Sequence, residues 1–160
     1  MRTRLGLVAI AMAVTLSLGA SGPAAYGAAA KTAPPFTSLQ VCTTFPAALV
    51  ARELGKHTPA QASYYPSKAT SAGSYATCFY RFSKLYYATV ELYGPPHPIT
   101  EVAGSKVPAL GPTGRLQISP PDTLVYVLSH GYEITIVGQT AFFSKSSLID
   151  LALYVTQHVP

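Results

Sequence analysis

The sequence is poor in the residues from which catalytic and metal sites are built. It contains six acidic residues, four histidines and two cysteines among its 160 positions. No two histidines have the i, i+4 spacing that places two zinc ligands on one face of a helix, and the chain has no Gly-x-Ser-x-Gly nucleophile elbow. We therefore expect no metal, no cofactor and no catalytic activity.

Two residue combinations keep an enzymatic alternative open. Glu91 and Glu133 fall on the expected outer faces of strands, and a paired-carboxylate hydrolase requires two such acids to converge. Ser129 and His130 supply a nucleophile and a base, but we expect neighbours in a turn to point apart. The alternative function is accordingly a small secreted enzyme whose site carries no recognised motif.

Positive charge is too thinly spread to indicate nucleic-acid binding. The formal net charge is +5, and the Lys and Arg residues do not cluster.

Arg2 and Arg4 precede an apolar run over residues 5–20, which is shorter than the about 20 residues that span a bilayer. This pattern predicts a signal peptide over residues 1–30 and a secreted, extracellular or cell-wall-associated protein without stable membrane insertion. An uncleaved membrane anchor is the alternative.

The two cysteines, Cys42 and Cys78, are expected to form a disulfide because oxidising compartments preserve such bonds. Two unrelated thiols are the alternative, since spacing alone does not establish geometry. After the signal peptide we expect an extended arm over residues 31–41, followed by one domain over residues 42–160.

Two helices are predicted from apolar residues at positions i, i+3, i+4 and i+7. The first has Thr44 as its N-cap and Pro46 in its first turn, and it ends at Gly55. The last starts at Ser146 or Ser147, where the sequence resembles a capping box. Their expected buried stripes are Ala47, Val50, Ala51 and Leu54, and Leu148, Leu151, Ala152 and Val155.

Strands are predicted where aromatic and β-branched residues alternate between turn signals. The predicted strands cover residues 75–82, 85–93, 115–119, 123–128 and 132–137. The core-facing residues of the first hairpin are Cys78, Tyr80, Phe82, Tyr86, Ala88, Val90 and Leu92. The elements together predict an α+β fold, in which an antiparallel sheet of about five strands carries the N-terminal and the C-terminal helix on one face.

Two long segments without a clear period, Lys56–Ser74 and Gly94–Gly114, are expected to be loops. Such loops are often functional, and tyrosine gives binding surfaces rigid amphipathic contact area. We therefore predict that the two loops meet at one rim of the sheet and bind a ligand there. The predicted ligand-binding residues are Tyr64, Tyr65, Tyr93 and His97. The alternative is that the tyrosines belong to the core of the sheet.

Several short motifs follow one another along the domain. Cys42 precedes a helix that ends in Leu54-Gly55, and Cys78-Phe79-Tyr80 lies in a strand that opens a hairpin. The segment Val107–Gly111, the hairpin around Gly131 and the pair Leu151-Ala152 follow. This pattern covers most of residues 40–158 and resembles a family of actinobacterial secreted proteins and lipoproteins of unknown function.

The resemblance implies a disulfide-bonded α+β domain of the cell envelope with no established activity. Many members carry a lipid-acceptor cysteine that this chain lacks, and many have tryptophan at the position of Tyr80. We expect a non-catalytic binding or interaction module whose partner is a cell-envelope protein, a peptide or a small ligand. An inhibitor-like protein that docks on another protein through its loops is a further alternative.

Overall fold

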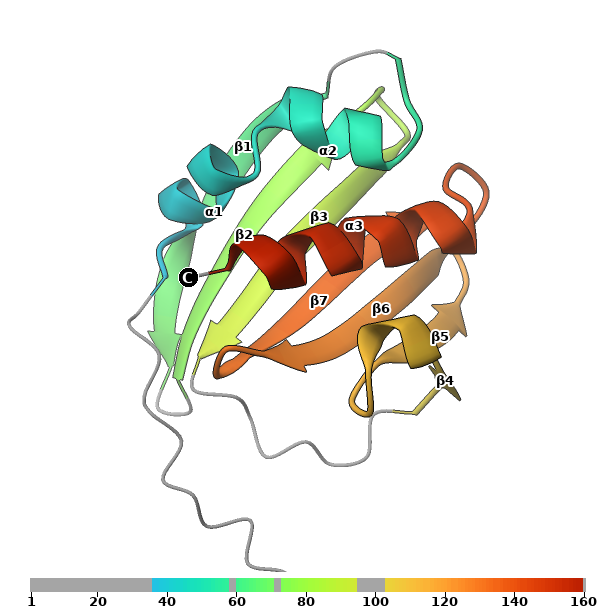
Figure 1. Cartoon of the computed structure of the whole chain (residues 1–160). Helices are drawn as coiled ribbons and strands as arrows, with labels where there is room; N and C mark the ends of the chain where they lie inside the picture. Colours follow the sequence, from blue (N-terminus) through green and yellow to red (C-terminus); the bar gives the residue numbers. More distant parts are fainter. Residues whose placement is uncertain (1–35, 58–59, 71–72, 95–102, 160) are drawn as a thin grey trace, which may run out of the picture.

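The computed structural model describes residues 36–57, 60–70, 73–94 and 103–159, without the side chains of residues 64–70, 73 and 74. Seven antiparallel strands form one sheet in the order β1-β2-β3-β7-β6-β5-β4, and three α-helices lie on one of its faces (Figure 1). The α+β class and the placement of the helices on one face are confirmed, whereas the expected number of strands was too low. No helix in the described ranges is long and apolar enough to cross a membrane.

The chain enters the domain through two short helices, α1 (Ser38–Thr44) and α2 (Ala47–Glu53). Thr37 caps α1: its side chain accepts a hydrogen bond from the Gln40 amide at 3.2 Å, and Gln40 Oε1 accepts from the Thr37 amide at 2.8 Å. This capping box explains why residues 38–41 are helical, where we expected an extended arm. Because Thr44 belongs to α1, the N-cap of α2 is Pro46.

Strand β1 (Gln61–Thr70) lies within the segment Lys56–Ser74, which we expected to be a loop. It pairs only with β2 among the described strands and is therefore an edge strand, where proline is tolerated. Its register with β2 shifts between Tyr65 and Lys68, the interval that contains Pro66. The bulge and the proline obscure the period-2 pattern by which a strand is recognised in a sequence.

The hairpin of β2 (Gly73–Arg81) and β3 (Tyr87–Gly94) confirms the first predicted pair of strands. Its helix-facing residues are as expected: Cys78, Tyr80, Ala88, Val90 and Leu92 are buried, and Phe82 and Tyr86 are half-buried. The Tyr80 hydroxyl donates to the Phe45 carbonyl at 2.7 Å, so this large core residue leaves no unpaired polar group.

The second half of the sheet also follows the sequence prediction. Its strands are β5 (Arg115–Ser119), β6 (Asp122–Ser129) and β7 (Tyr132–Gln139). A short strand β4 (Ser105–Lys106) and a 3₁₀-helix η1 (Pro108–Leu110) occupy part of the segment Gly94–Gly114, which we expected to be a loop throughout. Residues 95–102 of that segment lie outside the described ranges.

The last helix, α3 (Lys145–His158), starts one residue or more before the predicted position. Ser144 is its N-cap and accepts a hydrogen bond from the Ser147 amide at 3.1 Å, so Ser147 is not the cap. All four predicted stripe residues, Leu148, Leu151, Ala152 and Val155, are buried. Gly138 of β7 makes room for this stripe, because a Cβ there would lie 2.5 Å from Leu148 Cδ2.

The predicted disulfide is present and joins Cys42 of α1 to Cys78 of β2, with a Cα–Cα distance of 5.1 Å. It ties the N-terminal helices to the first three strands, whereas α3 packs on β6 and β7 (Figure 1). The helices α2 and α3 also contact each other, so the helical layer covers both halves of the sheet. Among the residues that the structure describes, no helix lies on the opposite face of the sheet, which we call the open face.

Candidate functional site

The described part of the predicted ligand-binding set lies on strands of the sheet. Tyr64 and Tyr65 belong to β1, where their backbones pair with Cys78 and Thr77; their side chains are not described. Tyr93 is half-buried on β3 and pairs with Tyr75 of β2. His97 lies outside the described residues. The expectation that Tyr64 and Tyr65 lie in a loop was wrong, because both belong to a strand, whereas their role in ligand binding stays a prediction.

The open face instead carries a row of polar residues across its central strands. Thr77 of β2 pairs with Glu91 of β3, Glu91 pairs with Thr135 of β7, and Thr135 pairs with Tyr126 of β6. Directly opposed residues lie on the same face of a sheet, so these four side chains share the open face. Thr77 and Thr135 are buried, and Glu91 and Tyr126 are partly exposed.

Glu91 is the centre of this row and is held by neighbouring hydroxyl groups. Thr89 Oγ1 donates to Glu91 Oε1 at 3.1 Å, and Tyr93 Oη donates to Glu91 Oε2 at 3.0 Å. Burial raises the pKa of Glu91 above its ordinary value, and hydrogen bonds from Tyr93, Thr89 and Tyr75 oppose that rise only in part. No described Lys or Arg lies within ion-pair distance of the carboxylate.

Tyrosine rings surround the carboxylate. Burial and the negative charge of Glu91 raise the pKa of Tyr93, and burial raises that of Tyr75. The pKa of Tyr126 is raised by burial and by the charges of Glu133 and Glu91. All three phenols therefore remain neutral hydrogen-bonding groups at physiological pH.

Two aromatic pairs lie on the open face, one on either side of the row of polar residues. The rings of Tyr75 and Tyr93 have centroids 4.6 Å apart, and those of Phe79 and Tyr87 are stacked at 4.9 Å. Phe79 follows Tyr75 by four positions along β2, a distance of roughly 13 Å. The polar row that contains Thr77, Glu91 and Thr135 therefore lies between two aromatic pairs.

The hydroxyl of Thr77 is buried beside the hydroxyl of Tyr75, with which it interacts. Thr77 is 4% exposed. Its backbone amide is satisfied, since it donates to Ser38 Oγ on α1 at 3.0 Å.

The sequence predicts that Glu91 lies on an outer strand face, but it does not indicate that Glu91 is the centre of a polar row. The outer positions of β3 could be found from alternation alone. The partners on β2 and β7 could not, because they depend on the register of strands far apart in the sequence. Glu91 and Glu133 do lie on adjacent strands, where Glu133 pairs with Tyr93, two residues from Glu91.

Ser129 and His130 do not point apart as we expected. Ser129 Oγ and His130 Nδ1 are 2.8 Å apart in the β6–β7 turn. His130 has a left-handed backbone, with φ of 52°, and this conformation brings its ring back toward Ser129. No described carboxylate lies within ion-pair distance of His130, so no third group orients the ring as in a catalytic triad.

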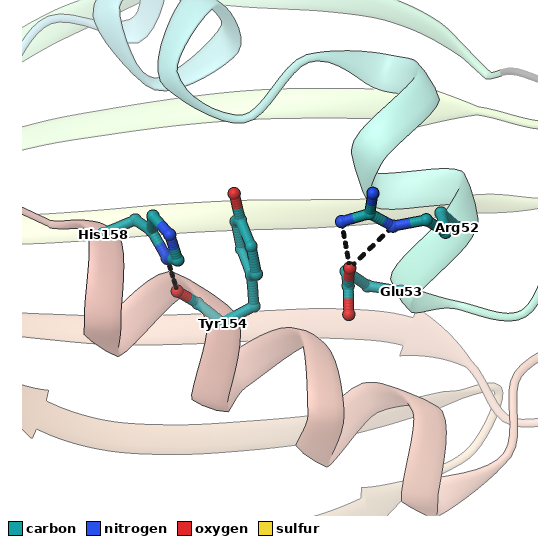
Figure 2. Close-up of polar contacts among 4 residues, drawn as sticks. All are labelled: Arg52, Glu53, Tyr154 and His158. Carbon is teal, nitrogen blue, oxygen red and sulfur yellow. Dashed lines mark hydrogen bonds and ion pairs between the residues drawn. The ribbon is translucent and has the colours of Figure 1, made fainter.

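A second group of polar residues projects from α2 and α3 into the space between these two helices (Figure 2). Arg52 and Glu53 of α2 form an ion pair at 2.8 Å, and the Arg52 side chain is 71% exposed. On α3, the rings of His158 and Tyr154 are stacked, and His158 Nδ1 lies 2.7 Å from the Tyr154 carbonyl. An exposed ion pair contributes little stability. A histidine side chain in the last turn of a helix commonly hydrogen-bonds one of the last backbone carbonyls. We interpret this group as structural.

No family model, curated protein or solved structure matches the chain. The resemblance to an actinobacterial secreted family therefore remains a prediction. The site is defined by its own geometry, in which a desolvated carboxylate lies among hydroxyl groups and aromatic rings on the open face.

The raised pKa of Glu91 predicts a specific pH dependence of stability. A carboxyl whose pKa is higher in the folded than in the unfolded protein contributes most below its unfolded pKa, and that contribution is lost as the pH rises through the folded pKa. Glu91→Gln keeps an acceptor for the hydroxyl groups but does not ionise. We therefore expect its stability relative to the wild type to increase as the pH is raised from 4 to 7.

Urea unfolding at several pH values measures this difference. Asp150→Asn, at an exposed position of α3, is the control for the loss of one negative charge. If the Glu91→Gln difference were the same at every pH, or if the control reproduced it, the pKa of Glu91 would not be raised by its surroundings in the folded protein.

Proposed function

We propose that the protein is a secreted, non-catalytic binding module of the cell envelope that holds a peptide or a small ligand on its open face. Secretion is supported by the signal-peptide pattern of residues 1–30 and by the Cys42–Cys78 disulfide. Binding is supported most directly by Glu91, a partly exposed carboxylate that is desolvated on a face without a described helix. Such a group costs stability, so its presence points to a role other than folding.

The composition of the open face supports recognition better than it supports folding alone. Aromatic rings provide contact area with little loss of side-chain entropy, and the hydroxyl groups between them provide directional hydrogen bonds. The pairs Tyr75–Tyr93 and Phe79–Tyr87 flank Glu91 and the threonines at a spacing that suits a short peptide or an elongated small molecule.

A fragment screen by NMR tests this proposal. The ¹⁵N-labelled, disulfide-bonded protein is titrated with a library of neutral, cationic and anionic fragments and capped dipeptides. We expect the amide shifts of the hits to concentrate at open-face positions of β2, β3, β7 and β6. Hits that concentrate on the helical layer, or no hits on the open face at millimolar concentration, would contradict the proposal.

A further inference from the structure

We propose that one end of the molecule docks on an anionic lipid surface, with Leu85 in contact with the lipid and Lys and Arg side chains on the headgroups. This end, which we call the basic end, comprises residues 81–86 around the β2–β3 turn, residues 142–145 at the start of α3, and Lys56 after α2 (Figure 1). The basic end is separate from the polar row of the open face, so this inference goes beyond the proposed function.

Leu85 is exposed in an ordered turn. It is 72% exposed, the largest fraction among the exposed large apolar residues of the described chain. Ser83 Oγ accepts hydrogen bonds from the Leu85 and Tyr86 amides at 3.1 and 3.2 Å, and the Tyr86 carbonyl accepts from the Phe82 amide at 2.9 Å. These bonds hold the turn without the leucine side chain. A single exposed leucine is ordinary on a protein surface, so its surroundings decide what it does.

Aromatic side chains lie beside Leu85. The Tyr86 ring stacks on the Phe142 ring with centroids 4.2 Å apart, and the Phe82 ring lies 6.1 Å from the same ring. All three aromatic residues are only half-buried, so each keeps part of its surface accessible. Aromatic rings next to an exposed leucine suit the boundary between lipid headgroups and acyl chains.

The fold brings four cations from separate parts of the sequence to the basic end. They are Arg81 at the end of β2, Lys84 in the turn, Lys145 at the start of α3 and Lys56 after α2. Lys56 Nζ lies 3.9 Å from the centroid of the Phe142 ring and donates to the Phe142 carbonyl at 2.8 Å. This contact joins a positive charge directly to the aromatic group.

The acids of the neighbouring elements are outnumbered by these cations. Glu53 forms an ion pair with Arg52 at 2.8 Å, so the two charges offset each other. Asp122 accepts a hydrogen bond from the Tyr87 hydroxyl at 3.5 Å, and Asp150 lies in the second turn of α3. The positive excess is complementary to an anionic surface, where each Lys or Arg strengthens binding about fivefold.

Leu85 distinguishes a lipid surface from a soluble polyanion. A polyanion in water compensates the cations but leaves the leucine side chain in water. A bilayer also removes that side chain from water, and the apolar contact adds to the electrostatic attraction. We therefore assign the basic end to the surface of a bilayer that contains anionic lipids.

Sedimentation with sucrose-loaded vesicles measures this docking. The disulfide-bonded protein, purified from the culture medium of an exporting host, is mixed with vesicles of phosphatidylcholine alone or with about one-third phosphatidylglycerol. We expect the anionic vesicles to bind at least about tenfold more tightly than the neutral ones, because several cations contribute. Binding should decrease steeply as added salt screens the charges.

Two variants and two matched controls locate the contact. Leu85→Ser should weaken binding to the anionic vesicles about tenfold. Leu39→Ser, at a position of α1 that is 55% exposed, should leave binding unchanged. Lys84→Gln should weaken binding about fivefold, whereas Lys106→Gln on the edge strand β4 should not. The ¹H–¹⁵N spectrum of each variant verifies its fold. All variants share residues 1–35, so differences between them report the substituted positions.

The contrary outcomes are distinct. Absence of binding to the anionic vesicles, or equal binding to the neutral ones, would overturn the anionic lipid surface as the partner. Equal losses for Leu85→Ser and Leu39→Ser would overturn the basic end as the contact. Binding to soluble polyglutamate as tight as to the vesicles, and unchanged by Leu85→Ser, would assign the cations to a polyanion instead of lipid. None of these results bears on the open face, which the fragment screen tests separately.

Discussion

Replacing Cys42 and Cys78 together by alanine is expected to lower the free energy of unfolding by about 4 kcal/mol. The two residues are 36 positions apart, and the crosslink restricts the unfolded chain over that whole loop. For a domain of this size the melting temperature should fall by roughly 10–20 °C. Urea unfolding monitored by circular dichroism measures the free energy, and calorimetry measures the melting temperature.

Reduction of the wild type provides the matched comparison for the double variant. The reduced protein and the Cys42→Ala/Cys78→Ala variant both lack the crosslink, so their melting temperatures should fall to similar values. A double variant as stable as the oxidised wild type would show that the loop is already ordered without the bond. A reduced protein that is much more stable than the variant would assign the loss to the buried Cys78 side chain instead.

The second large effect is expected at Leu148, which is fully buried on α3. Leu148→Ala removes side-chain volume from the contact with β7 and should cost about 2–5 kcal/mol of unfolding free energy. Leu153→Ala is the matched control, because Leu153 lies on the same helix but is only half-buried. Its cost should be clearly smaller. Equal losses would mean that the helix, rather than its buried stripe, determines the effect.

Gly138 adds a sharper form of this prediction. A methyl group at position 138 would lie 2.5 Å from Leu148 Cδ2 and 3.1 Å from Phe143 Cδ2, so Gly138→Ala alone overpacks the interface and should cost about 1–3 kcal/mol. In the double variant with Leu148→Ala, the new methyl group enters the space that the leucine vacates. We expect the loss of unfolding free energy in the double variant to be about 1 kcal/mol smaller than the sum of the losses in the two single variants. Strict additivity would show that the two residues do not share one packing contact.

The parts of the fold that were predicted correctly are those with a local period. The alternation in residues 75–93 and 115–137 identified both halves of the sheet, and the 3.6-residue period identified the stripe of α3. The strand β1 was missed because Pro66 and a bulge interrupt its pattern. The helix α1 was missed because the capping box at Thr37 and Gln40 was not recognised.

The candidate site required information that no local pattern contains. Tyr93 was predicted to bind a ligand, but on a loop rim, and its hydroxyl in fact donates to Glu91 within the sheet. The environment of Glu91 depends on its pairing with Thr135, which comes from the second half of the chain. Only the register of β3 against β7 brings the acid, the threonines and the tyrosines together on one face.

The pairing of β3 with β7 also has a consequence for the order of folding. Within β1–β3 and within β5–β7, consecutive strands lie close together in the sequence, whereas the pairing of β3 with β7 closes a chain segment of several tens of residues. Since local hairpins form before such long-range pairings, each half should nucleate by itself and the seam should close last. The open-face site crosses this seam, so the cluster around Glu91 is complete only in the fully folded molecule. The disulfide lies wholly within the first half, and its reduction should therefore speed amide hydrogen exchange in β1–β3 more than in β5–β7.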